Sequence, residues 1–141
     1  MLAKITDDFG PAFCDAVKEI LESGKKRFKS IRGKLDLVSE EHFGKRVPQG
    51  FEICFGWRNG KAYHCRTSEG LSKEETADLY VHVNHSLQRC LQTEWQSKEK
   101  NVDRVNARRF MTYHSASHPI TIRIGERNIR SGWIVDIYFK K

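Results

Sequence analysis

Several signals that would assign a location are missing from this chain of 141 residues. Its first ten residues contain no basic stretch followed by an apolar run. No apolar run anywhere approaches the ~18 residues of a membrane-spanning helix. These absences predict a cytoplasmic protein that is neither secreted nor inserted into a membrane.

The usual signatures of metal and catalytic sites are missing as well. The four cysteines form no CxxC pair and do not cluster with histidines, so the spacing of a zinc site is absent. The chain also has no nucleophile elbow, no glycine-rich phosphate loop and no HExxH motif. These absences favour a protein without metal or cofactor, and they favour a binding role over an enzymatic one.

The cysteines are expected to be reduced. An Asn-Gly dipeptide at 59–60 lies between two β-rich runs, which predicts a hairpin whose two turn residues both have positive φ. Counting outward from this turn places Cys54 opposite Cys65 as a hydrogen-bonded pair. In antiparallel sheets the Cα atoms of hydrogen-bonded pairs are farther apart than those of non-hydrogen-bonded pairs. That position and a cytoplasmic location favour two free thiols. Cys14 and Cys90 are expected to be small core residues.

The composition predicts one folded domain over residues 1–141. Hydrophobic residues make up 38% of the chain and charged residues 30%, as in ordinary globular proteins. No repeat, low-complexity stretch or change in composition divides the chain. The formal net charge of +7 favours an acidic partner, such as nucleic acid, an anionic membrane surface or an acidic protein face.

Two amphipathic helices are predicted. The first extends from about Pro11 to Ser30, because apolar residues recur at helical spacing after a proline suited to the first helical position. The second begins with a capping box formed by Ser72 and Glu75 and extends to about Gln96. Its apolar stripe consists of Thr76, Tyr80, Val83, Leu87, Leu91 and Trp95.

The remaining segments predict strands and loops. Residues 51–67 form the hairpin described above, and residues 34–50 a short strand followed by a loop. Residues 97–117 are polar, without clear periodicity, and are expected to form a long loop. Clean alternation in residues 120–139 predicts a second hairpin. The expected fold class is α+β: a single antiparallel sheet of two hairpins packed against two helices, in the order α-β-β-α-β-β.

This order of elements resembles the compact helix-plus-sheet layout of type III secretion chaperones and other small bacterial interaction domains. The resemblance covers most of the chain and is one of element order. It implies a chaperone-like module that acts through protein–protein interaction.

Three groups of basic residues are candidate contact sites. The run Gly24–Lys34 contains six basic residues and no acidic one, so it could follow a phosphate backbone or simply be a solvated helix end. The candidate partner-binding residues are Lys25, Lys26, Arg27 and Lys29 from this run, and Arg104, Arg108 and Arg109 from the second group. The third group is Arg123, Arg127 and Arg130.

The histidines supply the weaker candidates. His82 and His85 are three residues apart on the second helix, but at ~100° per residue both lie opposite its apolar stripe, so they are expected to be exposed and not to bind metal. His64, His114 and His118 could catalyse RNA cleavage if two of them converged with a basic residue.

Three functions therefore remain open. The first is a non-catalytic interaction module that binds an acidic protein. The second is a nucleic-acid-binding domain, which would require exposed aromatic residues, such as Tyr63 or Tyr138, as stacking platforms. The third is a small histidine-dependent nuclease or hydrolase.

Overall fold

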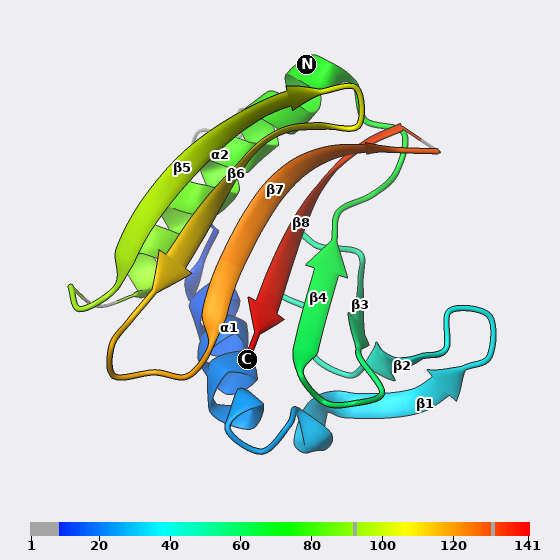
Figure 1. Ribbon diagram of the computed structural model, residues 1–141, viewed down its shortest axis with the longest axis vertical. Helices are drawn as coiled ribbons and strands as arrows, with labels where there is room; N and C mark the ends of the chain where they lie inside the picture. The colour runs from blue at the N-terminus through cyan, green and yellow to red at the C-terminus, as the bar shows by residue number, and fades with distance from the viewer. Residues whose placement is uncertain (1–8, 92, 131) are drawn as a thin grey trace.

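The structure is a computed structural model that describes residues 9–91, 93–130 and 132–141. Within these ranges, two helices and eight strands follow one another, with a short 3₁₀ helix, η1, between the first helix and the first strand (Figure 1). The elements are α1 (Pro11–Gly24), η1 (Lys29–Ile31), β1 (Arg32–Asp36), β2 (Glu41–Gly44), β3 (Ile53–Gly56), β4 (Ala62–Arg66), α2 (Lys73–Cys90), β5 (Gln96–Arg104), β6 (Ala107–His114), β7 (Thr121–Ile129) and β8 (Gly132–Lys140).

All eight strands belong to one antiparallel sheet in the order β1-β2-β3-β4-β8-β7-β6-β5. The C-terminal strand β8 lies between β4 and β7 and so joins the two halves of the sheet. Both helices pack on the same face, chiefly against the central strands. The α+β class and the single antiparallel sheet are confirmed. The predicted order α-β-β-α-β-β is wrong, because four further strands flank the two predicted hairpins.

The core lies between the helices and one face of the sheet. Val135, Ile137 and Phe139 of β8 and Ile122 and Ile124 of β7 are fully buried there, as their alternation predicts. From α2, the stripe residues Thr76, Tyr80, Val83 and Leu87 are also buried.

Each helix is shorter than predicted. After α1, Arg27 and Phe28 adopt left-handed backbone conformations, and the Phe28 N–H donates to the Ser23 carbonyl at 2.9 Å. This reversal directs Phe28 into the core, where its ring stacks on Tyr63. The capping box of α2 is confirmed, since Ser72 and Glu75 exchange side-chain-to-backbone bonds. This helix ends at Cys90 because the backbone is extended at Leu91 and leads into β5.

The predicted loop at 97–117 is a hairpin of two long strands, β5 and β6. Its signal is weak because β5 is the edge strand, and eight of its nine residues are exposed. An edge strand that buries neither face shows no alternation of apolar and polar residues.

The cysteines form two disulfides, Cys14–Cys90 and Cys54–Cys65, so the expectation of four free thiols is wrong. The predicted register of the hairpin is confirmed, but its turn is not. Only Gly60 of the dipeptide has positive φ, and the Trp57 N–H donates to the Ala62 carbonyl.

The hydrogen-bonded pairs therefore start at Trp57 and Ala62, one residue farther from the turn than predicted. Alternation then makes Cys54 and Cys65 a non-hydrogen-bonded pair, the type with the closer Cα atoms. Their Cα atoms are 4.0 Å apart. Since disulfides persist chiefly in oxidising compartments, the cysteines no longer support the cytoplasmic location, which stays a prediction.

None of the described helices has the length and apolar character required to cross a membrane.

Candidate functional site

The face of the sheet opposite the helices carries the candidate site. Along β4 and β8, the core residues alternate with His64, Arg66, Asp136, Tyr138 and Lys140, which point to this open face. Neighbouring strands add side chains in register, because Phe55 is paired with His64 and Arg123 with Tyr138. The open face is thus built from alternate positions of at least four adjacent strands.

A row of ring side chains crosses this face. The rings of His64 and Tyr138 are nearly parallel, with an interplanar angle of 6° and centroids 4.7 Å apart. Phe55 stacks on the other side of His64 at 5.8 Å, and Phe43 follows at 5.4 Å from Phe55. Tyr138 is half-buried, so one part of this row is open to solvent.

Arg123 extends the row beyond Tyr138. Its guanidinium carbon lies 5.5 Å from the Tyr138 ring centroid and 5.3 Å from that of Phe110. Arg123 is exposed, and no carboxylate in the described parts of the chain forms an ion pair with it. A free guanidinium between two aromatic rings can contact an anionic group while a flat group stacks beside it.

Two adjoining grooves occupy the open face. The first has a volume of about 500 Å³, and the second a volume of about 310 Å³. The first is lined by Trp57, Phe110, Thr112, Thr121, Arg123, Tyr138, Lys140 and Lys141. The second is lined by Asp36, Val38, Ser39, Glu41, Phe55, His64, Arg66, Arg127, Ile134 and Asp136. The stacked pair of His64 and Tyr138 separates the two.

The second groove shows that the sheet curls over its open face. Asp36, Val38 and Ser39 belong to β1 and the turn after it, whereas Arg127 and Ile134 belong to β7 and β8. These strands are several positions apart in the sheet, yet their side chains line the same groove. A flat sheet could not bring them together.

Two polar pairs lie in the second groove. Glu41 Oε1 is 2.7 Å from His64 Nε2, and both side chains are largely but not fully buried. Arg127 Nε donates to Asp136 Oδ2 at 2.6 Å. Burial raises the pKa of the Asp136 carboxyl above its usual value, although the charge and hydrogen bond of Arg127 act in the opposite direction.

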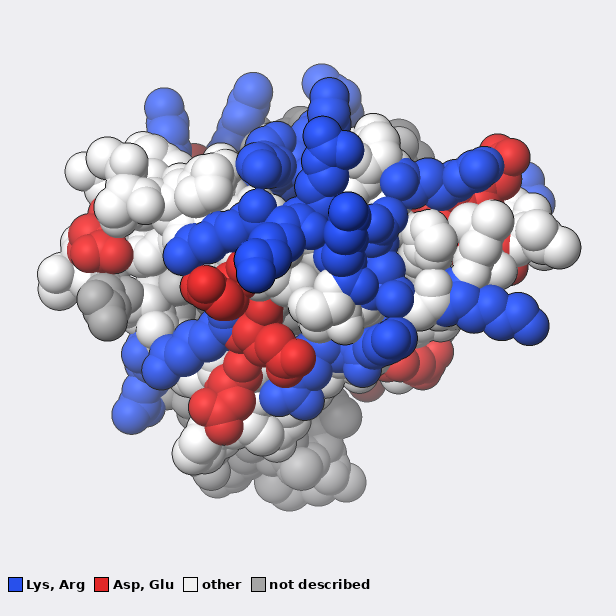
Figure 2. Space-filling model, turned by 90° about the horizontal axis from the view of Figure 1, so that it is seen from below, with Lys and Arg blue, Asp and Glu red and all other residues white. Residues whose placement is uncertain are grey.

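The first basic group joins the end of the first groove. Figure 2 shows Lys and Arg side chains gathered over the end of the molecule that is lower in Figure 1. Gly60 of the β3–β4 turn lies so close to Arg27 that a Cβ on it would be 2.6 Å from Arg27 Cβ. Arg32 donates to the Arg58 carbonyl at 3.2 Å, and the Lys141 N–H donates to the Lys61 carbonyl at 2.8 Å.

These contacts bring three segments of the chain together at one end of the molecule. Their exposed basic residues are Lys25, Lys26, Arg27, Lys29, Arg58, Lys61, Lys140 and Lys141, called here the basic end. Lys140 and Lys141 also line the first groove, so the basic end and this groove are continuous.

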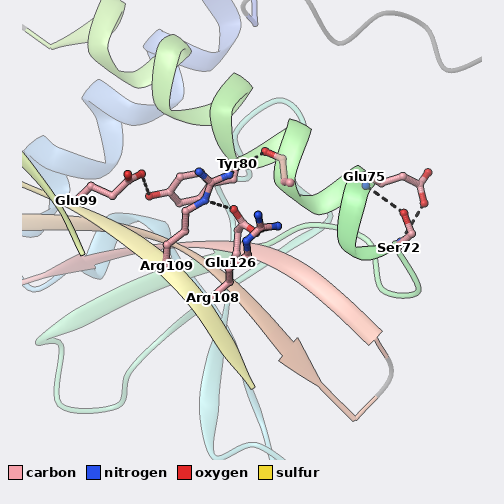
Figure 3. A network of polar contacts seen from close by, with 8 residues as sticks. Ser72, Glu75, Tyr80, Glu99, Arg108, Arg109 and Glu126 are labelled. Carbon is pink, nitrogen blue, oxygen red and sulfur yellow. Dashed lines mark hydrogen bonds and ion pairs between the residues drawn. The ribbon is translucent and has the colours of Figure 1, made fainter. Parts of the chain in front are cut away.

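Two residues of the second basic group, Arg108 and Arg109, belong to a network of polar contacts (Figure 3). Arg109 lies on the helix side of the sheet, where it pairs with the fully buried Glu126 and its guanidinium carbon is 4.2 Å from the Tyr80 ring centroid. Arg108 also approaches Glu126, at 3.9 Å. The Tyr80 hydroxyl donates to Glu99 at 2.9 Å. Arg109 is therefore committed to an internal ion pair, whereas Arg104 is exposed at the end of β5.

The candidate histidines occupy different places. His64 lines the second groove of the open face. His118 lies on the helix side beside Trp95, with ring centroids 5.6 Å apart, and burial lowers its pKa. His114 is exposed at the end of β6 and lines neither groove. His64 and His118 are thus on opposite faces of the sheet.

Two further expectations are corrected. His82 is 6% exposed and makes an edge contact with the Phe9 ring, so it is not a surface residue, whereas His85 is exposed. Tyr63 is fully buried, and its hydroxyl donates to the Arg46 carbonyl at 2.6 Å. Burial raises the pKa of Tyr63 to about 12. Tyr63 therefore cannot act as a stacking platform, whereas Tyr138 has the required position.

Within the described ranges, no three His, Cys, Asp or Glu side chains are grouped closely enough to hold a metal ion. No protein-family model matches the chain, and neither does any curated protein or solved structure. The resemblance in element order to type III secretion chaperones stays a prediction.

Proposed function

We propose that the protein binds single-stranded nucleic acid along the open face of its sheet. The bases would stack on the aromatic side chains of the first groove. The phosphates would contact the arginine and lysine side chains between and beyond those rings.

The observation that carries this proposal is the alternation of rings and cations in the first groove. Arg123 lies between Tyr138 and Phe110, and Lys140 Nζ is 5.5 Å from the centroid of the Trp57 ring. A single strand presents unpaired bases and phosphates in alternation, so it can use both kinds of side chain at once. Base stacking on a protein ring is worth about 1–3 kcal/mol per base and does not depend on sequence.

Charge supports the same ligand. Lys140 and Lys141 of the basic end line the first groove. The Lys141 N–H donates to the Lys61 carbonyl in the β3–β4 turn, and Gly60 of this turn lies against Arg27. An acidic protein would also be attracted by this charge, but it does not present a planar group and an anionic group in regular alternation, as a single strand does. The exposed rings therefore favour nucleic acid over an acidic protein.

The test compares Tyr138→Ala with Tyr138→Phe. Binding of a fluorescent single-stranded oligonucleotide is followed by anisotropy at fixed salt. Tyr138→Ala removes the ring and is expected to weaken binding about 5- to 150-fold, the equivalent of one lost stacking contact. Tyr138→Phe keeps the ring and is expected to bind as the unmodified protein does.

Arg123→Gln and Lys18→Gln form the matched pair for charge. Both remove one exposed positive charge, but Lys18 lies on α1, away from the open face. Arg123→Gln is expected to weaken binding and Lys18→Gln to leave it unchanged. Equal effects of the two charge variants, or of the two Tyr138 variants, would contradict a specific site on the open face.

A further inference from the structure

We propose that the protein cleaves, in the second groove, the RNA strand that the first groove binds. His64 transfers the proton, and Glu41 positions the His64 ring. The reaction is transesterification at phosphorus by the 2′-hydroxyl of the RNA. This inference rests on the proposed function, because it requires that a strand occupy the open face.

Glu41 and His64 have the geometry of a histidine oriented by a carboxylate. Glu41 Oε1 is 2.7 Å from His64 Nε2, which fixes the ring and leaves Nδ1 to exchange a proton with a bound ligand. The ring is also held from both sides, by Phe55 and by Tyr138. A side chain held by stacking and a hydrogen bond needs little reorganisation when a substrate binds.

The location favours a ligand continuous with the first groove. Tyr138 lines the first groove and stacks directly on His64, which lines the second. A base stacked beside Tyr138 therefore places the adjoining sugar and phosphate near the boundary of the two grooves. Phosphodiester groups are the substrate class that this position would present to His64.

Two arginines of the second groove can hold a phosphate. Arg66 lies in β4 two residues after His64 and pairs with Glu69 at 3.4 Å, and its side chain is 38% exposed. Arg127 is 44% exposed while its Nε bonds Asp136. Each guanidinium has more N–H groups than these contacts use, so each can also donate to a phosphate oxygen. Such donors stabilise the charge that develops on the oxygens in the transition state.

The atoms and electrons balance without a further reactant. His64 accepts the proton of the 2′-hydroxyl, and the 2′-oxygen forms a bond to phosphorus. The bond from phosphorus to the 5′-oxygen breaks, and the protonated His64 returns the proton to that oxygen. The products are a 2′,3′-cyclic phosphate and a 5′-hydroxyl, and Glu41 stabilises the imidazolium that exists between the two transfers.

The experiment uses the disulfide-bonded protein and two oligonucleotides of the same sequence. One is single-stranded RNA and the other is its fully 2′-O-methylated form, which lacks the reacting hydroxyl. We expect both to bind with similar affinity and only the RNA to be cleaved, with 2′,3′-cyclic phosphate ends detected by mass spectrometry.

Four variants separate the roles. His64→Gln is expected to lower kcat by about 10²- to 10⁴-fold, as for loss of a general base. Glu41→Gln is expected to lower kcat by about tenfold or more with KM unchanged. The controls are His85→Gln on the exposed side of α2 and Glu74→Gln in the first turn of α2, and both are expected to keep the full rate.

The outcomes distinguish the two proposals. Binding of both oligonucleotides without cleavage of the RNA overturns the catalytic inference and leaves the proposed function intact. Failure to bind either oligonucleotide overturns both. Cleavage that survives in His64→Gln with unchanged kcat also overturns the inference, since another group or a contaminant would then be responsible. If Glu41→Gln has an unchanged thermal midpoint and the same kcat as the unmodified protein, Glu41 has no part in the mechanism.

Discussion

At the scale of single residues, the buried acids divide into two kinds. Glu126 is wholly buried on the helix side and contacts two arginines. Asp136 is 3% exposed on the open face and contacts one, Arg127, whose own side chain is 44% exposed. Burial raises the pKa of Asp136 despite this partner. The ion pair therefore does not fully offset the cost of burying the carboxylate.

The raised pKa of Asp136 makes a prediction for Asp136→Asn. A carboxyl whose pKa is raised on folding binds more protons in the folded protein, so its contribution to stability falls as the pH rises from its unfolded to its folded pKa. The asparagine variant is therefore expected to be as stable as the unmodified protein or more stable at pH 7. Its advantage should shrink as the pH falls through the raised pKa of the folded protein toward 3.8, the usual pKa of an aspartate carboxyl. Urea denaturation at several pH values measures this.

Greater destabilisation by Asp136→Asn at pH 7 than at pH 4 would contradict the prediction. It would mean that the charge on Asp136 stabilises the fold through Arg127. Asp36→Asn is the matched control, because Asp36 lines the same groove in β1 but is half-buried.

At the scale of elements, the sequence predicts best the segments that bury one face. The alternation of β7 and β8 and the capping box of α2 are local signals, and each is confirmed. The edge strand β5 lacks such a signal because neither of its faces is buried. The end of α1 is set by a tertiary contact, the burial of Phe28 against Tyr63, which the helical periodicity of the run does not contain.

The disulfides give a prediction at the same scale. Cys14–Cys90 links α1 to α2 over 76 residues, whereas Cys54–Cys65 links β3 to β4 over 11. The loop-entropy relation gives about 4.5 kcal/mol for the longer link and about 2.8 kcal/mol for the shorter. The double variant Cys14→Ala/Cys90→Ala is therefore expected to lose more stability than Cys54→Ala/Cys65→Ala.

Guanidinium denaturation of the two double variants compares these links directly. Cys54 and Cys65 are fully buried, whereas Cys14 and Cys90 are only partly buried. Loss of packing alone would therefore destabilise Cys54→Ala/Cys65→Ala more, so the opposite order reports loop closure. Equal losses, or a greater loss for Cys54→Ala/Cys65→Ala, would show that the link between the helices does not restrict the unfolded chain as expected.

At the scale of the whole molecule, the candidate site could be predicted only in part. The outward positions of Tyr138 and Lys140 follow from the alternation of β8. The position of Glu41 beside His64 does not, because residues 41–44 carry no clear strand signal and only the curl of the sheet brings Glu41 to His64. The basic end likewise depends on the meeting of α1, the β3–β4 turn and the C-terminus. Contacts between segments far apart in sequence leave no local pattern.

The basic end makes the last prediction. Lys25, Lys26, Arg27 and Lys29 are exposed; Arg27 lies against Gly60 of the β3–β4 turn, and Lys25 pairs with Glu22 at 3.1 Å. Each phosphate contact with a single strand contributes about 0.7 to the slope of log affinity against log salt. Replacing all four with Gln is therefore expected to make that slope shallower by roughly three units if every one of them contacts the strand. The stability of the fold should change little, since none of the four is buried.

Anisotropy titrations over a range of salt concentrations measure the slope, and Lys18→Gln/Lys73→Gln on the two helices is the control. Each lost contact should change the slope by the same amount, so a strand that reaches only Arg27 and Lys29 should give about half the full change. The size of the change in slope thus gives the number of these four residues that contact the strand beyond Lys140 and Lys141. An unchanged slope would confine the nucleic acid to the grooves and reduce the basic end to a source of long-range attraction.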